Sequence, residues 1–202
     1  MSLDAISIPP ATGDPTGLIV ALHGWGANAR DVASLVPVLN LPNYHVLLPD
    51  APFSHPQVPG GKMWYDLARD DYKGLEQSQQ LLTDWLKSLE NITGIPPEST
   101  ILMGFSQGGA MILDVGLTLP VAGLACLSGY LHRTPQDLEP PLPSVLMVHG
   151  RQDTVVPIDA AHRARDYLIS IGVPMQYKEF DMGHEIQPQV LEVTREFILV
   201  NT

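Results

Sequence analysis

Short apolar runs alternate along this chain with longer segments in which apolar residues recur at three- and four-residue spacing. The short runs are rich in leucine or β-branched residues and predict strands. Several of them are apolar throughout, which is typical of strands covered on both faces. These runs are GLIVALHG (17–24), YHVLLPD (44–50), STILMG (99–104), GLACLSG (123–129), SVLMVHG (144–150) and MQYKEF (175–180).

The clearest helix is predicted over Leu75 to Leu89, ahead of Gly94 and the pair Pro96-Pro97. Residues at helical spacing share one face, which can then pack against a sheet. Here that face carries Leu81, Leu82, Trp85, Leu86 and Leu89. Further helices are expected at Arg30 to Val38, Gln107 to Leu117, Asp159 to Ile171 and Gln187 to Leu199.

Strands that alternate with helices predict an α/β fold, in which a mostly parallel central sheet has helices on both faces and right-handed crossovers between strands. We find no internal repeat and no low-complexity tract, so a single domain over residues 1–202 is expected. The one long irregular segment runs from Ala51 to Gly74 and is rich in proline and glycine. Irregular segments of this length inside a compact domain are often functional.

Composition narrows the classes of partner. The 202 residues are 45% hydrophobic, and 11 Lys and Arg against 22 Asp and Glu give a net charge of -11. This charge argues against nucleic acid and anionic membrane surfaces as partners and favours small neutral molecules. No signal peptide and no stable membrane insertion are predicted. The single cysteine, Cys126, excludes an internal disulfide and a cysteine-built zinc site, and it suits a cytoplasmic protein.

Candidate chemistry lies where the predicted strands end, because sites of α/β folds gather at the carboxyl ends of parallel strands. Four of these ends carry polar turns that contain glycine, namely HGWGAN, GFSQGG, HGRQD and DMGHE. In chain order, three of the turns supply Ser106, Asp153 and His184. This is the order of a Ser-Asp-His triad in α/β-hydrolases.

The segment GFSQG, Gly104 to Gly108, matches the G-x-S-x-G elbow in which a strand turns sharply into a helix. Glycines are needed there because the turn brings neighbouring backbone too close for side chains. Such a turn holds the serine hydroxyl above the sheet and directs the next helix N-terminus toward the developing negative charge. The alternative is that the glycines merely separate a strand from a helix while Ser106 satisfies a local backbone group.

A serine hydroxyl needs a base within hydrogen-bond reach, and His184 is predicted to be that base because it follows the last strand beside Gly183. Asp153 would bond the far nitrogen of the imidazole and fix its tautomer. Its rivals are Asp159, expected near the start of a helix, and Asp181, which precedes the histidine by three residues. The other histidines that we weighed lie in apolar strand patterns or in loop or helix patterns: His45, His149, His55, His132 and His162.

The HGWG turn supports two interpretations. Gly24, Gly26 and Ala29 also fit the G-x-G-x-x-A form of a dinucleotide fingerprint, and Asp50 lies near the distance expected of a ribose-binding acid. A dinucleotide site leaves the other three turns unexplained, whereas a hydrolase uses all four. In a hydrolase this turn presents a backbone N–H to the oxyanion, together with the N–H of Gln107.

From about Gly17 to His184 the chain resembles the phospholipase, carboxylesterase and acyl-protein thioesterase family of α/β-hydrolases. The resemblance is carried by LHGWGAN, GGKMWYDL, GFSQGGAM, LSGYL, HGRQDTVVP and DMGHEI. It implies a catalytic triad of Ser106, Asp153 and His184. It also implies an oxyanion hole formed by the backbone N–H groups of Trp25 and Gln107.

The chain departs from the family pattern in two places. Family members commonly carry leucine and aspartate where this chain has Trp25 and Asn28. The oxyanion role uses only backbone, so the indole changes the shape of the acyl pocket instead. The part before Gly17 is short, and its antiparallel strands are expected to be reduced to one near Leu3 to Ile8.

The resemblance also places the long irregular segment beside the site. Trp64 and Tyr65 either anchor this loop on the core or contact the substrate. The link from Tyr130 to Pro143 has fourteen residues with four prolines, too few for a cap domain. We therefore expect an open groove for short to medium acyl chains, with substrate-binding residues Trp25, Met63, Trp64 and Tyr65.

The function predicted from these features is a serine hydrolase that cleaves carboxylic esters or thioesters through an acyl-enzyme on Ser106. No metal and no cofactor is implied. Within hydrolysis, the alternative is an enzyme that prefers lysophospholipid or acyl-protein substrates. From another class, the alternative is a catalytically silent binding protein on the same fold.

Overall fold

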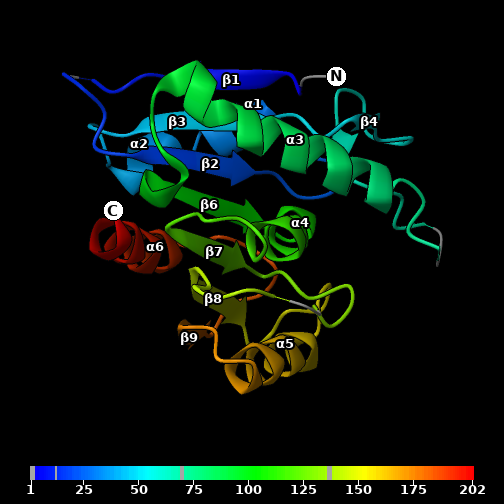
Figure 1. Ribbon diagram of the computed structural model, residues 1–202. Helices are drawn as coiled ribbons and strands as arrows, with labels where there is room; N and C mark the ends of the chain where they lie inside the picture. The colour runs from blue at the N-terminus through cyan, green and yellow to red at the C-terminus, as the bar shows by residue number, and fades with distance from the viewer. Residues whose placement is uncertain (1–2, 12, 69–70, 136–137) are drawn as a thin grey trace.

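The computed structural model describes residues 3–11, 13–68, 71–135 and 138–202. Its main sheet contains β1 (Ala5–Ile8), β2 (Leu18–Leu22), β3 (His45–Pro49), β6 (Thr100–Phe105), β7 (Gly123–Leu127), β8 (Ser144–Gly150) and β9 (Met175–Phe180). Their order across the sheet is β1-β3-β2-β6-β7-β8-β9, which Figure 1 shows from top to bottom. β1 pairs antiparallel with β3, and the other neighbouring pairs are parallel.

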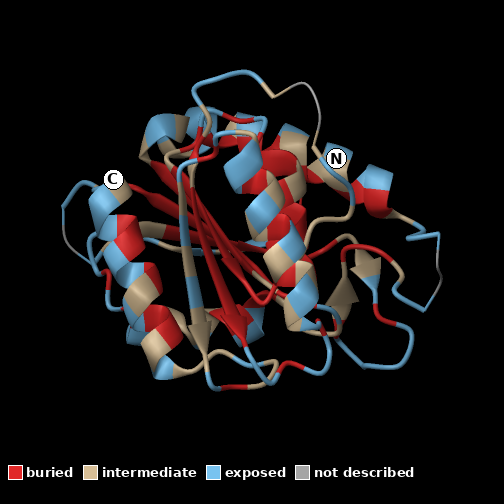
Figure 2. Ribbon diagram, turned by 90° about the horizontal axis from the view of Figure 1, so that it is seen from below, coloured by how far each residue is buried: buried red, intermediate tan, exposed pale blue. Residues whose placement is uncertain are grey.

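Helices cover both faces of this sheet. They are α1 (Ala29–Ala33), α2 (Val36–Leu39), α3 (Leu75–Thr93), α4 (Gln107–Gly116), α5 (Ile158–Ser170) and α6 (Pro188–Asn201), and a 3-10 turn, η1 (Pro97–Ser99), precedes β6. Helices α3, α4 and α5 pack on one face, and α1, α2 and α6 pack on the other. In Figure 2 the buried strands lie between helices whose outward sides are exposed.

The strands supply both halves of the core because their side chains alternate between the faces. In β2, Leu18, Val20 and Leu22 join the cluster under α3, α4 and α5, whereas Ile19 and Ala21 join the cluster on the opposite face. All five side chains are nearly inaccessible to solvent. Full burial of an aliphatic side chain stabilises a fold by about 1.5 to 3 kcal/mol. The predicted α/β fold with a mostly parallel sheet and helices on both faces is confirmed.

Two expectations about local structure need adjustment. The helix expected at Arg30 to Val38 is divided into α1 and α2. Pro37 lacks an N–H, and in a continuous helix its ring would clash with the carbonyl of Ala33, so the chain ends one helix and begins another. The clearest predicted helix continues past Leu89 to Thr93, and Gly94 then ends it with a φ of 73°, which suits glycine.

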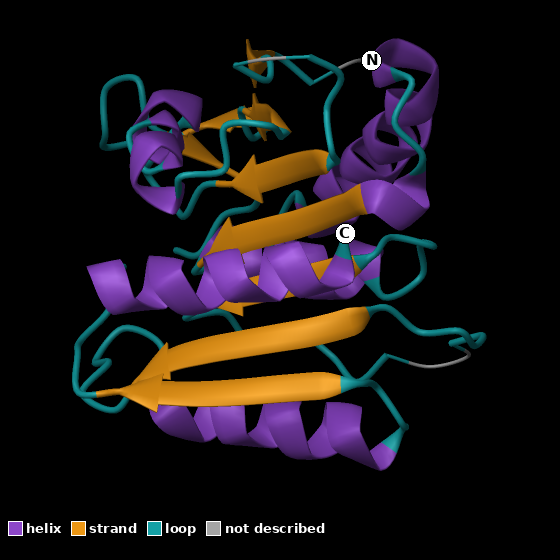
Figure 3. Ribbon diagram, turned by 90° about the vertical axis from the view of Figure 1, so that its left-hand side faces the viewer, coloured by secondary structure: helices purple, strands orange, loops and turns teal. Residues whose placement is uncertain are grey.

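The segment from Ala51 to Gly74 is not wholly irregular. It contains the short antiparallel pair β4 (Phe53–Ser54) and β5 (Lys62–Met63). This pair lies near the carboxyl ends of the parallel strands. In Figure 3 the arrowheads of these strands all point toward the same side of the molecule, and this side is called the carboxyl edge of the sheet. The four glycine-containing turns identified from the sequence follow β2, β6, β8 and β9 at this same edge.

Candidate active site

Ser106 lies on a strained turn between β6 and α4. Its φ of 54° and ψ of -117° are unusual for a residue with a side chain. A Cβ on Gly104 would lie 2.4 Å from the carbonyl oxygen of Gly108, and a Cβ on Gly108 would lie 2.6 Å from that of His23. Both positions therefore require glycine. A hydrogen bond to the neighbouring strand keeps Ser106 in this conformation: its N–H donates to the carbonyl of Leu127, at the end of β7, at 2.8 Å.

Three turns bring Ser106, His184 and Asp153 into one hydrogen-bonded chain. His184 Nε2 lies 2.9 Å from Ser106 Oγ, and its Nδ1 lies 2.7 Å from Asp153 Oδ2. The imidazole also packs on the ring of Phe105, with the ring centroids 4.8 Å apart. With the Nδ1 proton facing the carboxylate, Nε2 is free to accept the serine proton. The arrangement can thus convert a hydroxyl into a nucleophile.

The carboxylate of Asp153 is fixed by its own turn. Its side chain is fully buried, and Oδ1 accepts from the N–H groups of Val155 at 2.9 Å and Val156 at 2.8 Å. His149, from the end of β8, lies 3.4 Å from Oδ2 and donates through Nε2 to the carbonyl of Val156. Every oxygen of Asp153 therefore has a defined neighbour, and Oδ2 is directed at His184.

The rival acids lie elsewhere. Asp181 is exposed and pairs with Arg151 at 2.6 Å. Asp159 lies in the first turn of α5. Among the other histidines, His162 pairs with Glu179. In the described part of the chain, none of these groups is hydrogen-bonded to Ser106 or His184.

The two predicted oxyanion donors lie in neighbouring turns: Gln107 follows Ser106, and Trp25 follows Gly24, where an added Cβ would lie 3.4 Å from Ser106 Cβ. Gln107 is the first residue of α4, so its N–H has no partner within the helix. Trp25 stands in the turn after β2, and its indole is 38% exposed and packs edge-on against His55. Among the described residues, neither N–H is recorded with a protein acceptor. Two unused N–H groups and a helix N-terminus are the elements that an oxyanion hole needs.

The segment from Ala51 to Gly74 is hydrogen-bonded to the elements that carry both predicted oxyanion donors, Trp25 and Gln107. β5 pairs with the turn that carries Trp25, because the N–H of Gly26 donates to the carbonyl of Lys62 and the N–H of Lys62 donates to the carbonyl of Ala27, both at 2.8 Å. The backbone position of Trp25 is therefore tied to the loop.

The same segment is tied to α4 through the side chain of Gln107. Its Oε1 accepts from the N–H of Trp64 at 2.9 Å, and its Nε2 donates to the carbonyl of Tyr65 at 2.8 Å. Trp64 and Tyr65 are both fully buried, and the indole N–H of Trp64 donates to the carbonyl of His23. Of the two roles expected for these aromatics, the geometry favours anchoring of the loop. Met63 is half-buried in β5.

His23 has a structural role that the sequence patterns did not indicate. Its Nδ1 donates to the carbonyl of Gly24 at 2.7 Å, and its Nε2 accepts from the N–H of Ala51 at 3.0 Å. Burial lowers the pKa of His23, in keeping with a neutral ring that both donates and accepts. Its position directly after a fully apolar strand was the available signal.

The residues of the dinucleotide alternative have other partners. The carboxylate of Asp50, proposed there as a ribose ligand, accepts from the N–H of Ala29 at 2.8 Å and so holds the start of α1. Asn28 caps the same helix, accepting from the N–H of Arg30 at 2.9 Å. The N-terminus that would receive a pyrophosphate thus belongs to a helix of five residues whose donors are already used.

A cavity of about 520 Å³ lies beside Ser106. Its lining comes from the loop after β5, the loop after β7 and the start of α5, and it includes Leu67, Tyr72, Tyr130, Val155 and Ala160. The four residues expected to bind substrate, Trp25, Met63, Trp64 and Tyr65, are not among its lining residues. This cavity therefore lies on the side of Ser106 that faces α5 and the turn after β8.

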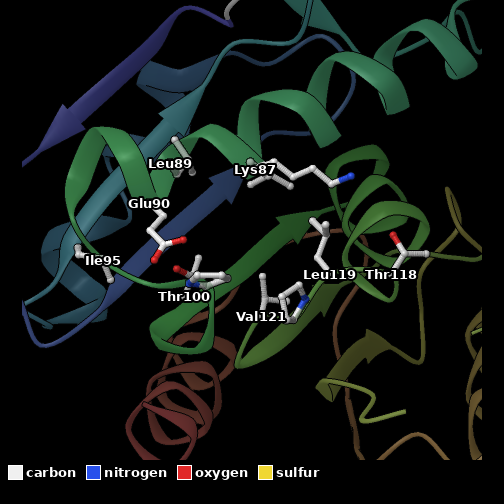
Figure 4. A pocket seen from close by; sticks show the side chains of 11 residues that line it. Lys87, Leu89, Glu90, Ile95, Thr100, Thr118, Leu119 and Val121 are labelled. Carbon is white, nitrogen blue, oxygen red and sulfur yellow. The ribbon is translucent and has the colours of Figure 1, made fainter. Parts of the chain in front are cut away.

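A second cavity, of about 220 Å³, lies at the other edge of the sheet (Figure 4). It is formed by the end of α3, the start of β6 and the loop before β7. Its lining includes Leu86, Leu89, Ile95, Leu119 and Val121, together with Lys87 and Glu90. No serine, cysteine or histidine of the described chain lines it, and the hydroxyls of Thr100 and Thr118 donate to nearby backbone carbonyls, so it contains no hydroxyl paired with a histidine.

The chain belongs to the phospholipase/carboxylesterase family, whose model matches residues 4–202. This family and the fold define the class of the protein as a serine hydrolase of the carboxylesterase type. Among the described residues, no helix combines the length and the apolar character that crossing a membrane requires.

Individual relatives agree with this family. The chain is 34% identical to acyl-protein thioesterase 1 of Mycosarcoma maydis over 82% of this chain and 81% of that protein. It is 29% identical to acyl-protein thioesterase 1 of Gibberella zeae over 94% of this chain and 92% of that protein. The crystal structure of esterase PE8 superposes with a TM-score of 0.90 at 31% identity and covers 100% of both chains.

Proposed function

We propose that this protein cleaves carboxylic esters of short to medium acyl chains through an acyl-enzyme on Ser106. The observation that carries the proposal is the hydrogen-bonded chain from Ser106 Oγ through His184 to Asp153, with links of 2.9 and 2.7 Å. A serine on a strained elbow with a base and an oriented acid has the parts required for nucleophilic catalysis.

In the first half-reaction, Ser106 Oγ attacks the carbonyl carbon while its proton passes to His184 Nε2. The imidazolium is stabilised by Asp153, and the negative oxygen of the tetrahedral intermediate accepts from the N–H groups of Trp25 and Gln107. The C–O bond to the alcohol then breaks, and His184 returns the proton to the leaving alkoxide. The acyl group is now an ester of Ser106.

In the second half-reaction, water takes the place of the alcohol. His184 accepts a proton from the water as its oxygen attacks the acyl carbon, and the same two N–H groups receive the oxyanion. Collapse of this intermediate breaks the bond to Ser106 Oγ, which recovers its proton from His184. The products are a carboxylic acid and the free enzyme.

The preference for short to medium acyl chains is supported by the open cavity beside Ser106. No helical insertion covers it in the described part of the link between β7 and β8. Each methylene that is fully buried adds about 0.8 kcal/mol to binding. An open cavity leaves the distal methylenes of a long chain in water, so this gain should end after a few carbons.

A thioester substrate is the second candidate. Two of the relatives described above are named acyl-protein thioesterase 1. The same nucleophile, base and oxyanion donors would serve a thiolate leaving group. A silent binding protein is less well supported, because each member of the triad is present and hydrogen-bonded. The cytoplasmic setting suggested by the single cysteine stays a prediction.

The proposal is tested by trapping the acyl-enzyme. The protein is mixed with 4-nitrophenyl butyrate, quenched in acid within the first turnovers and measured by intact mass and peptide mapping. A butyryl adduct on Ser106 and an initial burst of nitrophenol are expected. An adduct on another residue, or turnover with no dependence on Ser106, would contradict the mechanism. Nitrophenyl esters of increasing length should peak in kcat/KM before palmitate, without a jump at the micelle threshold.

A further inference from the structure

The cavity beside Ser106 has a charge pattern that the triad does not use. Most of its lining is apolar, including Leu67, Leu131, Val155, Val156, Pro157 and Ala160. Two arginines, Arg133 and Arg163, complete it, and no aspartate or glutamate of the described chain lines it. The space next to the nucleophile is therefore apolar with a positive rim.

These two arginines lie at the cavity of an acidic protein, which has twice as many acidic as basic residues. Arg151 pairs with Glu179, and Arg165 pairs with Asp166 at 2.7 Å. In the described ranges, Arg133 and Arg163 have no carboxylate within ion-pair distance. Their positive charge remains available to a ligand.

Helix geometry directs Arg163 toward the cavity. Ala160, Arg163, Ala164 and Tyr167 recur at three- and four-residue spacing on α5, and all of them line it. Arg165, two positions along, lies on the other side of the helix, with its guanidinium 4.8 Å from the centre of the Tyr177 ring. The two neighbouring arginines thus have different environments on one rigid element.

Arg133 stands next to a buried polar network that fixes its loop. The Tyr65 hydroxyl lies 2.5 Å from both Tyr130 Oη and His132 Nε2, and His132 Nδ1 lies 2.6 Å from an oxygen of Asp114. The contact between His132 Nδ1 and Asp114 is short but does not have hydrogen-bond alignment. Burial raises the pKa of Tyr130, so its phenol adds no negative charge to the cavity.

We propose that this cavity recognises a carboxylate carried by the ester substrate, in its acyl or its alcohol part, and that Arg133 and Arg163 determine this specificity. The inference rests on the function proposed above. It refines the expectation of neutral partners drawn from the net charge of -11. Exposed charges are screened beyond about 10 Å at 0.1 M salt, so acidic residues farther than this from the cavity act only weakly on a ligand inside it.

The test uses two pairs of esters, each matched except for one charge. The first pair is mono-4-nitrophenyl adipate and its methyl ester, with the carboxylate in the acyl part. The second pair is 4-(butanoyloxy)phenylacetate and its methyl ester, with the carboxylate in the alcohol part. In at least one pair, the carboxylate member should have about tenfold higher kcat/KM, mainly through a lower KM, as expected for charge-assisted contacts at a partly exposed site.

The variant R133Q/R163Q should abolish the preference while retaining turnover of the methyl esters. R165Q is the matched control, because it removes a neighbouring guanidinium that does not line the cavity, and it should keep the preference. Raising the ionic strength should shrink the preference of the unmodified protein.

Equal kcat/KM within both pairs, or a preference that survives in R133Q/R163Q, would overturn the inference while leaving ester hydrolysis intact. Absence of turnover for all four esters, together with no acyl-enzyme, would contradict the proposed function and this inference with it.

Discussion

The central sheet has one cavity at the amino ends of its parallel strands, called the amino edge, and another at their carboxyl ends, called the carboxyl edge. The two cavities differ in how their polar groups are bonded. At the amino edge the polar groups are satisfied locally: Thr100 Oγ1 donates to the carbonyl of Pro96, and Thr118 Oγ1 donates to that of Val115. At the carboxyl edge the polar groups bond across turns that are far apart in sequence, as His184 does to Ser106 and Asp153. A hollow alone therefore does not identify a site.

Backbone strain beside the two cavities follows the same division, whereas Asn40 ends α2 in the left-handed conformation that asparagine adopts readily. Ser106 and Ser128, with φ values of 54° and 50°, lie at the carboxyl ends of β6 and β7. Such conformations cost about 1 to 3 kcal/mol each and persist only where surrounding structure holds them. The amino-edge cavity contains no residue of this kind among those described. The comparison predicts that substitutions at the carboxyl edge affect turnover, whereas those at the amino edge affect stability alone.

The largest effect is expected from the nucleophile and its base. Ser106→Ala and His184→Ala should each lower kcat by about 10⁵- to 10⁶-fold, and combining them should add little, because triad members act as a unit. Steady-state assays with 4-nitrophenyl butyrate measure this, and circular dichroism verifies folding. Independent, multiplicative losses would show that the two side chains do not act together.

The acid should come next. Asp153→Asn should lower kcat by about 10³- to 10⁴-fold, because an amide in place of the carboxylate leaves His184 in the wrong tautomer. Asp159→Asn and Asp181→Asn are the matched controls and should stay close to the unmodified rate. A large loss in either control, with Asp153→Asn near normal, would reassign the acid.

A smaller effect is expected from the link between α4 and the long loop. Gln107→Met keeps the volume but leaves the N–H of Trp64 and the carbonyl of Tyr65 without partners, so the oxyanion donors should shift and kcat should fall by about 10- to 100-fold. Gln80→Met removes an exposed amide that bonds Asp84 and serves as the control. Unchanged kcat in Gln107→Met would mean that the loop does not set the donor geometry.

The smallest effect on turnover should come from the amino-edge cavity. Leu89→Ala should lower the free energy of unfolding by about 2 to 4 kcal/mol, since Leu89 is nearly fully buried, and should leave kcat/KM within twofold. Ile92→Ala, at an exposed position of the same helix, should change neither quantity. Denaturant melts and assays of the folded protein test both parts. A strong loss of kcat/KM in folded Leu89→Ala would contradict the claim that the amino edge contributes to stability and not to turnover.

The catalytic residues at the carboxyl edge could be predicted from the sequence, because they lie in short motifs that directly follow recognisable strands. Glycine spacing around Ser106 and the order of the strand ends suffice to bring Ser106, Asp153 and His184 into one hypothesis. The division of the Arg30 to Val38 helix follows from Pro37 and could have been anticipated. The anchoring of Trp64 by Gln107 could not, because it joins residues 43 positions apart through a hydrogen bond that leaves no periodic pattern.

The cavity walls were harder still to predict. Trp25, Met63, Trp64 and Tyr65 were expected to bind substrate because the family resemblance places their segments beside the site. Which bulky residue faces the solvent depends on packing against other elements, and Trp64 is taken into the core. Arg133 and Arg163 come from a loop and a helix that only the tertiary fold brings together.

The most direct test of the central claim is reaction with a fluorophosphonate probe, measured by intact mass. We predict one adduct per chain, located on Ser106 by peptide mapping and absent from the folded Ser106→Ala protein. The probe needs an activated serine, so labelling reports the Ser106–His184–Asp153 chain and not merely an exposed hydroxyl. Labelling of Ser106→Ala to the same extent as the unmodified protein, or no labelling of the folded unmodified protein, would contradict the assignment of the nucleophile.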